Sequence, residues 1–391
     1  MRNRWGVLAV LFFVRATMAV QFQSVAAVAP LLGADFGVSL ADIGILVGLY
    51  SVPGVALALP GGAIGQWLGD KKTVLAGLVL MMAGSCIMAF SSSWSGQISG
   101  RLVAGVGGVL MAVLMTKMVA DWFTGKELST AMAIFVNSWP IGIAISLLVL
   151  PPIGVVHGSA AVDLAVAALI AVGTGLLALS YRSPAVSTGT ARSNGRPGLH
   201  AAMAVVCAGS IWGLYNIGFI MVFSFGPSML VERGWSITAA GSAVSILLWL
   251  SAVSVPLGGF LADRTGRHEA IMVSCFLVTA MLMMVATRTD AIITTVVALG
   301  MLSGLAAGPI LSLPPRVLEP DTRAIGMGVF FSISYIGLVL GPTLGGTYAT
   351  WAGSAGAAFD LGAAVLLICP VILWMFQHFQ SGAKIRVQSS S

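Results

Sequence analysis

Charged side chains are scarce in this sequence. Only 8% of its 391 residues are Asp, Glu, Lys or Arg, whereas 58% are hydrophobic. Average proteins carry about 25% charged residues, so this composition excludes an ordinary soluble domain. Apolar runs recur along the chain, and each has the length of about 20 residues that a helix needs to cross the hydrocarbon core of a bilayer. The sequence therefore predicts an all-α integral membrane protein whose partner is the lipid bilayer.

Sequence motifs of catalysis and phosphate binding are also missing. The chain has no G-x-S-x-G, no glycine-rich phosphate loop ending in lysine, and no cluster with metal-ligand spacing. Its cysteines fall in four separate apolar runs, at Cys86, Cys207, Cys275 and Cys369. We therefore expect neither an enzyme nor a bound metal or cofactor, and an ATP-driven pump is disfavoured.

The net charge of +6 does not indicate a nucleic-acid partner. With a cytoplasmic N-terminus and an even number of spans, most Lys and Arg residues fall at the cytoplasmic side, which is the positive-inside pattern of membrane proteins. The reversed topology would place them outside. This distribution predicts that both chain termini are cytoplasmic.

The two halves of the chain resemble each other. An offset of 197 residues aligns Pro30 with Pro227 and Phe22 with Phe219. A repeat of half the chain length is typical of transporters built from two parallel bundles. Twelve spans are predicted, at residues 5–33, 40–66, 72–92, 96–120, 127–150, 160–182, 201–230, 237–262, 270–288, 291–315, 325–350 and 355–379.

These spans predict two six-helix bundles related by pseudo-twofold symmetry. The first bundle occupies residues 1–182 and the second occupies residues 200–380. A linker at 183–199 joins them, because this stretch is rich in Ser, Thr, Gly and Pro and nearly free of large apolar residues. A cytoplasmic tail follows at 381–391.

A short charged loop between two apolar runs carries the most specific motif. It reads Gly259-Phe-Leu-Ala-Asp263-Arg264-Thr-Gly266-Arg267-His268. This loop resembles the signature G-x-x-x-D-R-x-G-R-[RK] of the major facilitator superfamily, matching it at Gly259, Asp263, Arg264, Gly266 and Arg267. The first half contains a degenerate copy of this motif from Gly62 to Gly69, in which Gln66 replaces the acid and Trp67 replaces the base.

The fourth span adds a second resemblance. Arg101, Gly105 and Gly107 match the R-x-x-x-G-x-G pattern of the family, in which the arginine is proposed to serve proton coupling. The resemblance implies a monomeric bacterial inner-membrane secondary transporter that alternates between inward-open and outward-open states, as a symporter or antiporter with a coupling proton. The chain also looks broadly like the cyanate and nitroimidazole branch. Gating or coupling roles are implied for Arg101 and for the motif residues Gly62, Gly69, Gly259, Asp263, Arg264, Gly266 and Arg267.

Arg15 is the most informative single residue. It lies near the middle of the first span, where a charge costs at least about 2.5–3.5 kcal/mol unless water, a counter-ion or a ligand accompanies it. The repeat aligns Arg15 with Trp212, in a span rich in aromatic residues. Two interpretations remain open, because Arg15 either faces a transport cavity or snorkels to the membrane surface. We predict a cavity formed by Arg15, Gln21, Phe22, Asn137, Trp139, Trp212, Tyr215, Asn216, Phe219 and Tyr335.

The 13 acidic residues all fall in loops or near span ends. Transporters of cations usually hold a carboxylate within the membrane, so its absence beside Arg15 favours an anionic or neutral solute. We therefore predict transport of a small organic or inorganic anion through a central cavity. The alternative is a proton-coupled efflux antiporter for amphiphilic drugs, which Arg101 and the aromatic residues favour. Nitrate is disfavoured, because the second and eighth spans contain no internal arginine.

Overall fold

The described part of the chain is helical throughout. The computed structural model describes residues 4–57, 69–123, 127–182, 198–319 and 322–389. Twelve segments in these ranges are long and apolar enough to cross a membrane. The helices of the first half are α1 (Arg4–Ala27), α2 (Ala29–Phe36), α3 (Leu40–Leu49), α5 (Asp70–Phe90), α6 (Trp94–Trp122), α7 (Leu128–His157) and α8 (Ser159–Ser180).

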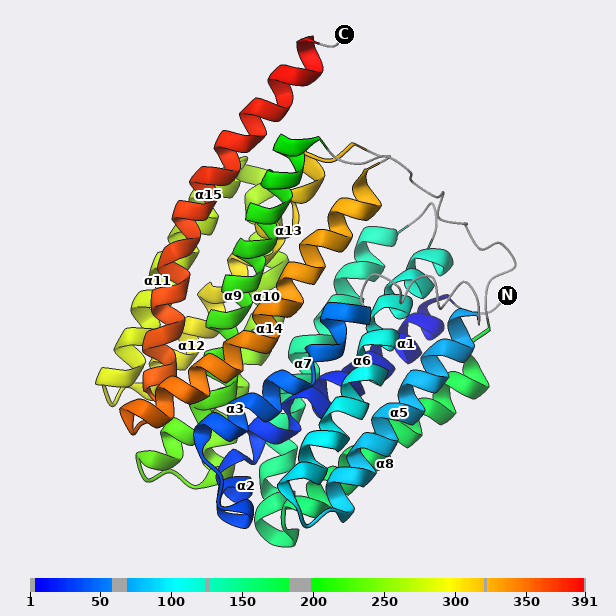
Figure 1. Ribbon diagram of the computed structural model, residues 1–391, viewed down its shortest axis with the longest axis vertical. Coiled ribbons are helices and arrows are strands. Elements are labelled where there is room, and N and C mark those ends of the chain that lie inside the picture. The colour runs from blue at the N-terminus through cyan, green and yellow to red at the C-terminus, as the bar shows by residue number, and fades with distance from the viewer. Residues whose placement is uncertain (1–3, 58–68, 124–126, 183–197, 320–321, 390–391) are drawn as a thin grey trace.

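The helices of the second half form the seventh to twelfth spans. They are α9 (Leu199–Glu232), α10 (Ile237–Thr265), α11 (His268–Arg288), α12 (Ile292–Ser303), α13 (Ala307–Leu311), α14 (Arg323–Ala352) and α15 (Ala357–Ser389). Figure 1 shows the halves side by side, with the blue-to-green helices of the first half packed against the green-to-red helices of the second. The expected all-α membrane fold with twelve spans is therefore confirmed.

Three predicted spans are interrupted, and in the second span the break is a turn at Tyr50 and Ser51 that follows α3. The first span, expected as one helix, breaks at Val28, whose backbone leaves the helical region before α2 begins with Pro30 in its first turn. Proline suits the first turn of a helix because its missing N–H has no intrahelical partner there. The tenth span contains a short 3₁₀ turn at Gly304–Ala306 between α12 and α13.

Two predicted boundaries lie largely outside the described residues, and a third differs from the prediction. The second span continues from α3 through residues 52–57, while the remainder of its predicted range lies outside the described residues. The predicted linker lies outside them as well, apart from its last two residues. At the other end of the chain, α15 continues to Ser389, so residues expected to form a tail extend the last helix.

Glycines bring helix backbones into contact within each half. A Cβ on Gly77 of α5 would lie 2.7 Å from the carbonyl oxygen of Gly107 on α6, and one on Gly84 would lie 2.5 Å from that of Gly100. In lipid, where apolar surfaces gain little by leaving the solvent, close packing of this kind holds helices together. The glycines of the fourth span therefore serve as a helix contact.

The two halves meet at the end of the bundle opposite the start of α1. We call this end the distal face and the end where α1 begins the terminal face. At the distal face α3 packs on α14, where a side chain on Gly44 would collide with the carbonyl of Pro342. The backbone N–H of Ala41 donates to Thr350 Oγ1 at 2.9 Å. The Gln23 amide also donates across the halves, to the carbonyl of Phe223 at 2.9 Å.

Candidate functional site: a cavity between the halves

A cavity of about 280 Å³ lies between the two halves. Helices α1, α6 and α7 line it from the first half, and α9, α10, α13 and α14 line it from the second. It extends toward the terminal face, where Leu311 and Phe331 form part of its wall. The predicted residues on this wall are Arg15, Phe22, Asn137, Trp139, Trp212, Tyr215, Asn216, Phe219 and Tyr335.

Gln21 is the exception among the predicted cavity residues. It is buried inside the first half, where its amide donates to the carbonyl of Met81 at 2.7 Å and to Ser85 Oγ at 2.8 Å. Its carbonyl oxygen accepts a bond from the Tyr50 hydroxyl at 3.3 Å. Neighbouring positions of a helix point about 100° apart, so Phe22 faces the cavity while Gln21 faces the bundle interior.

Arg15 reaches the cavity with most of its hydrogen-bonding capacity unused. Its guanidinium lies 4.5 Å from the centre of the Phe135 ring. One nitrogen donates to the Phe135 carbonyl over a long 3.4 Å. Among the described residues that line the cavity, Arg15 alone carries a formal charge, and no carboxylate accompanies it. The wall is therefore positive and can accept an anion.

Arg101 has the opposite environment. It is fully buried, and its guanidinium donates to the carbonyls of Leu46 at 3.1 Å, Gln21 at 2.7 Å and Phe22 at 2.5 Å. It also lies 4.7 Å from the centre of the Tyr50 ring. These contacts tie α1, α3 and α6 together and explain how the interior holds this cation.

Aromatic rings form much of both cavity walls. On α9, Trp212 stacks on Tyr215 at 5.5 Å, and Tyr215 stacks on Phe219 at 6.3 Å with the rings 8° apart. On the first half, Phe22 lies 5.2 Å from Trp139. The spacing of the α9 rings, three or four residues apart, places them on one face of the helix. The cavity thus presents flat apolar surfaces beside a single cation.

Several polar groups of the wall already have partners in the protein. The Tyr215 hydroxyl donates to the Ser303 carbonyl at 2.8 Å, and the Asn216 amide donates to the Trp212 carbonyl at 2.6 Å. Ser251 and Ser334 each donate to the carbonyl four residues earlier in their own helices.

Tyr335 differs from these groups. Its hydroxyl has no hydrogen bond with any described residue, and its ring rests on Gly54, where a Cβ would lie 2.6 Å from the ring carbon Cε1. Arg15 and Tyr335 both line the cavity. Tyr335 comes from the second half and Arg15 from the first, so each half contributes one of the two groups.

Sequence reasoning missed several wall residues. Tyr50, Ser51, Ser251 and Ser334 line the cavity but belonged to no predicted set. The repeat aligns Tyr50 with Leu247, an apolar residue, so it gave no signal at this position. The remaining signal was an aromatic residue within an apolar span, which is equally typical of ordinary packing.

The signature loop lies at the terminal face, away from the cavity. Gly266 ends α10 with a left-handed backbone (φ +66°), a conformation that glycine adopts without strain. Asp263 is exposed and lies 4.0 Å from His268 Nε2. In the degenerate copy of the motif in the first half, Gly69 also has a positive φ of 85° and precedes α5, whereas Gly62 lies outside the described residues. The gating roles of these residues stay a prediction.

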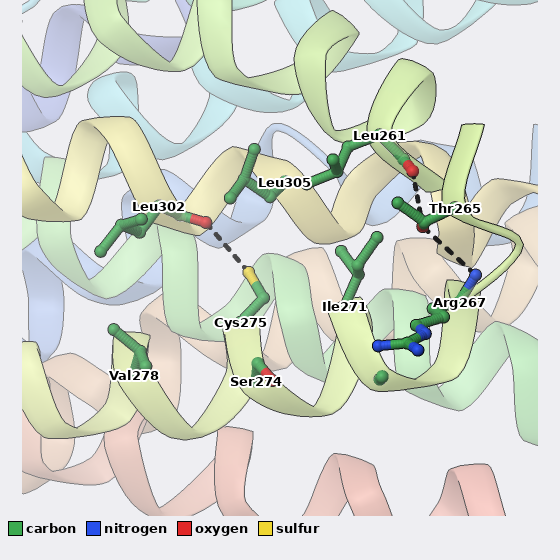
Figure 2. A pocket seen from close by; sticks show the side chains of 10 residues that line it. Leu261, Thr265, Arg267, Ile271, Ser274, Cys275, Val278, Leu302 and Leu305 are labelled. Atoms are coloured by element: carbon green, nitrogen blue, oxygen red, sulfur yellow. Dashed lines mark hydrogen bonds between the residues drawn. The ribbon is translucent and has the colours of Figure 1, made fainter. Parts of the chain in front are cut away.

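A second hollow, of about 330 Å³, lies beside this loop. Figure 2 shows its lining, with Arg267 near one end and Cys275 donating to the carbonyl of Leu302 at 3.1 Å. Its walls come from α10, α11, α12 and the adjoining 3₁₀ turn, all within the second half. The central cavity is the better candidate, because residues of both halves line it and it contains the charged Arg15 within a predicted span.

Comparisons with known proteins agree with this architecture. The sequence profile described as Major Facilitator Superfamily matches residues 11–225 and 201–388. The chain is 25% identical to the lysosomal dipeptide transporter MFSD1 of Danio rerio over 383 residues, covering 89% of this chain and 81% of that protein. It is 22% identical to the hexuronate transporter of Bacillus subtilis over 405 residues, covering 95% and 94%. The crystal structure of a bacterial homologue of the human lysosomal transporter Spinster superposes with a TM-score of 0.72 at 16% identity, covering 98% and 97%.

Proposed function

Because this chain belongs to the Major Facilitator Superfamily, we propose that it moves a small anion across the membrane by alternating access through the central cavity. It is a multi-pass membrane transporter of small solutes and not an enzyme. The observation that supports an anionic solute is Arg15, which is the charged residue of a cavity wall whose described residues include no carboxylate.

The energetic argument rests on the hydrogen-bond acceptors that Arg15 lacks. A cation in the membrane interior needs acceptors, and the single 3.4 Å bond to Phe135 leaves most of its donors unused. An arginine fork binds a carboxylate through two parallel charge-assisted hydrogen bonds. A bound carboxylate would therefore supply the missing acceptors. The hexuronate transporter of Bacillus subtilis, named for a carboxylate-bearing solute, supports the same class of substrate.

Alternating access is supported by the unequal contact between the halves. The halves touch closely at the distal face through α3 and α14, while the cavity extends toward the terminal face. A solute would enter from the terminal face in this arrangement and leave when the distal contacts separate. We place the termini in the cytoplasm of a bacterial cell, in the inner membrane, and expect a monomer with the domain boundaries given above.

The test is ligand binding to the purified protein and its Arg15 variants. A solute at 100 times its dissociation constant stabilises the folded state by about 2.7 kcal/mol, which a thermal shift detects. Arg15→Gln should weaken anion binding at least about 30-fold, because removing one partner of a buried charge pair costs about 2 kcal/mol or more. Arg15→Lys should retain part of the affinity, since it keeps the charge without the fork.

Arg288→Gln is the matched control for this experiment. Arg288 lies at the distal end of α11 and pairs with Asp360 on the exposed surface at 2.7 Å. This variant should bind the anion as the unaltered protein does. Unchanged anion affinity in Arg15→Gln would overturn the proposed role of Arg15.

The aromatic walls favour one alternative, efflux of amphiphilic drugs coupled to protons. Flat aromatic surfaces suit lipophilic ligands, yet a lipophilic cation would meet the positive charge of Arg15 with no carboxylate on the described wall. Stabilisation by lipophilic cations, with no response to anions, would move this alternative to first place.

A further inference from the structure

We propose that the solute is a small planar aromatic monocarboxylate, held by Arg15 and Tyr335 at its carboxylate and by rings of both halves at its faces. This inference rests on the proposed function and narrows its substrate class. It separates such a solute from two other kinds of carboxylate, the hydroxylated sugar acid and the zwitterionic amino acid.

The charge of the cavity limits the solute to one carboxylate. Arg15 offers one guanidinium, and the rest of the described wall carries no further cation for a second carboxylate. The wall also has no carboxylate for an ammonium group. An amino acid or peptide would therefore bring a cation into a cavity that cannot neutralise it, and its binding would lose affinity.

The carboxylate position follows from two groups that have free donors and come from different halves. Arg15 on α1 keeps donors beyond its long bond to Phe135, and the Tyr335 hydroxyl on α14 has no partner among the described residues. Both side chains line the cavity, Arg15 from the first half and Tyr335 from the second. One carboxylate can accept from both groups, which would connect the two halves through the solute.

The ring position follows from the aromatic walls. Trp212, Tyr215 and Phe219 form a stacked series on α9, while Phe22 and Trp139 face the cavity from the first half. Aromatic rings prefer offset-stacked or edge-to-face contacts with other rings, and a flat solute makes such contacts with both walls. A saturated ring of the same size is puckered and makes fewer of them.

The polar groups of the wall argue against a solute with many hydroxyls. Tyr50, Tyr215, Asn216, Ser251 and Ser334 already donate to protein acceptors. Beyond Arg15 and Tyr335, this leaves Ser51, Asn137 and the indole N–H groups of Trp139 and Trp212 as the described wall donors without a partner. A sugar acid would exchange its hydration for few new hydrogen bonds, and each hydroxyl left unpaired lowers its affinity. The volume of about 280 Å³ lies just below the range of about 300–1,000 Å³ typical of drug-sized ligands, which suits a single ring.

The experiment compares four probes by calorimetry on the purified full-length protein. Benzoate is the planar anion, cyclohexanecarboxylate the puckered anion, glucuronate the hydroxylated anion and phenylalanine the zwitterion. We expect benzoate to bind about 10-fold more tightly than cyclohexanecarboxylate, the factor that one or two aromatic contacts supply. Glucuronate and phenylalanine should bind more weakly still.

Variants test which wall produces the preference. Trp212→Leu should reduce benzoate affinity and leave cyclohexanecarboxylate affinity within about threefold, because it removes a stacking surface and keeps an apolar one. Trp351→Leu is the matched control, since Trp351 lies on α14 with 80% of its surface exposed and away from the cavity. Its benzoate preference should equal that of the unaltered protein.

The outcomes separate this inference from the proposed function. Absence of binding by every anion would overturn both. Equal binding of benzoate, cyclohexanecarboxylate and glucuronate, lost in Arg15→Gln, would keep the anion transporter and overturn the aromatic solute. A preference for benzoate that survives in Trp212→Leu would also overturn the assignment of the α9 rings.

Discussion

At the scale of single residues, Arg15 and Arg101 show that an arginine within a membrane span can serve either of two purposes. Arg101 donates to three carbonyl groups and is fully enclosed, so its charge is compensated by the protein itself. Arg15 has one long bond and reaches a cavity. A compensated cation holds helices together, whereas an uncompensated one is available to a ligand.

This contrast predicts that substitution by Gln affects the stability of the protein differently at the two positions. Arg101→Gln should lower the free energy of unfolding by about 2 kcal/mol, because hydrogen bonds to a charged group contribute about 1.5–3 kcal/mol and the shorter amide cannot reach three carbonyls. Arg15→Gln should leave stability unchanged or raise it, since it removes a poorly compensated charge. Thermal denaturation in detergent measures both, and equal destabilisation by the two variants would contradict this distinction.

The sequence could place both arginines within spans but could not assign their surroundings. Phe22 lies seven residues after Arg15, and Phe219 lies seven residues after Trp212, so each pair shares one helical face and lines the cavity. The carbonyl groups that accept from Arg101 lie on α1 and α3, far away in the sequence, and no local sequence pattern predicts them. Gln21 was misplaced for the same reason, since its partners lie on α5 and in the second span.

At the scale of elements, the spans were predictable and their interruptions were not. Apolar length is a local property, so the predicted twelve spans correspond to the helices that the structure describes. The break at Val28 has a local signal in Pro30, but prolines also occur inside α7, α9 and α10, so proline alone does not mark a break. The 3₁₀ turn at Gly304–Ala306 lies against α10. A side chain on Gly304 would collide with the Ser254 hydroxyl of α10, so this close approach requires glycine there.

The contact between α3 and α14 predicts a variant with impaired cycling. A Cβ on Gly48 would lie 2.5 Å from the carbonyl oxygen of Val339, so Gly48→Ala forces the two helices apart. Overpacking of this kind costs about 1–3 kcal/mol. The population of the closed distal face should then fall by about 5- to 150-fold, and transport into proteoliposomes should slow accordingly.

Gly175→Ala is the control for this prediction. Gly175 lies on α8 with no atom within 4 Å of an added Cβ, so the same methyl group meets open space. Its transport rate should equal that of the unaltered protein. Normal transport by Gly48→Ala would show that the α3–α14 contact does not limit the cycle.

At the scale of the whole molecule, the internal repeat predicted two halves but not their arrangement. An offset of 197 residues describes which helices correspond, and this correspondence holds in either state of a transporter. The closed distal face depends instead on contacts between halves, such as Ala41 with Thr350 and Gln23 with Phe223. These contacts must break for a solute to leave through that face.

A disulfide across the distal face tests this requirement. Ala41 and Thr350 are joined by a 2.9 Å hydrogen bond, close enough to attempt a cross-link between cysteines at both positions. The four natural cysteines are first replaced by alanine, so that the new pair reacts alone. Oxidation should abolish transport in proteoliposomes, and reduction should restore it, while each single-cysteine variant transports under both conditions. Anion affinity should stay unchanged in the oxidised protein, because the cavity extends toward the terminal face and the cross-link lies at the distal face. Continued transport by the cross-linked protein would show that the distal face is not the exit.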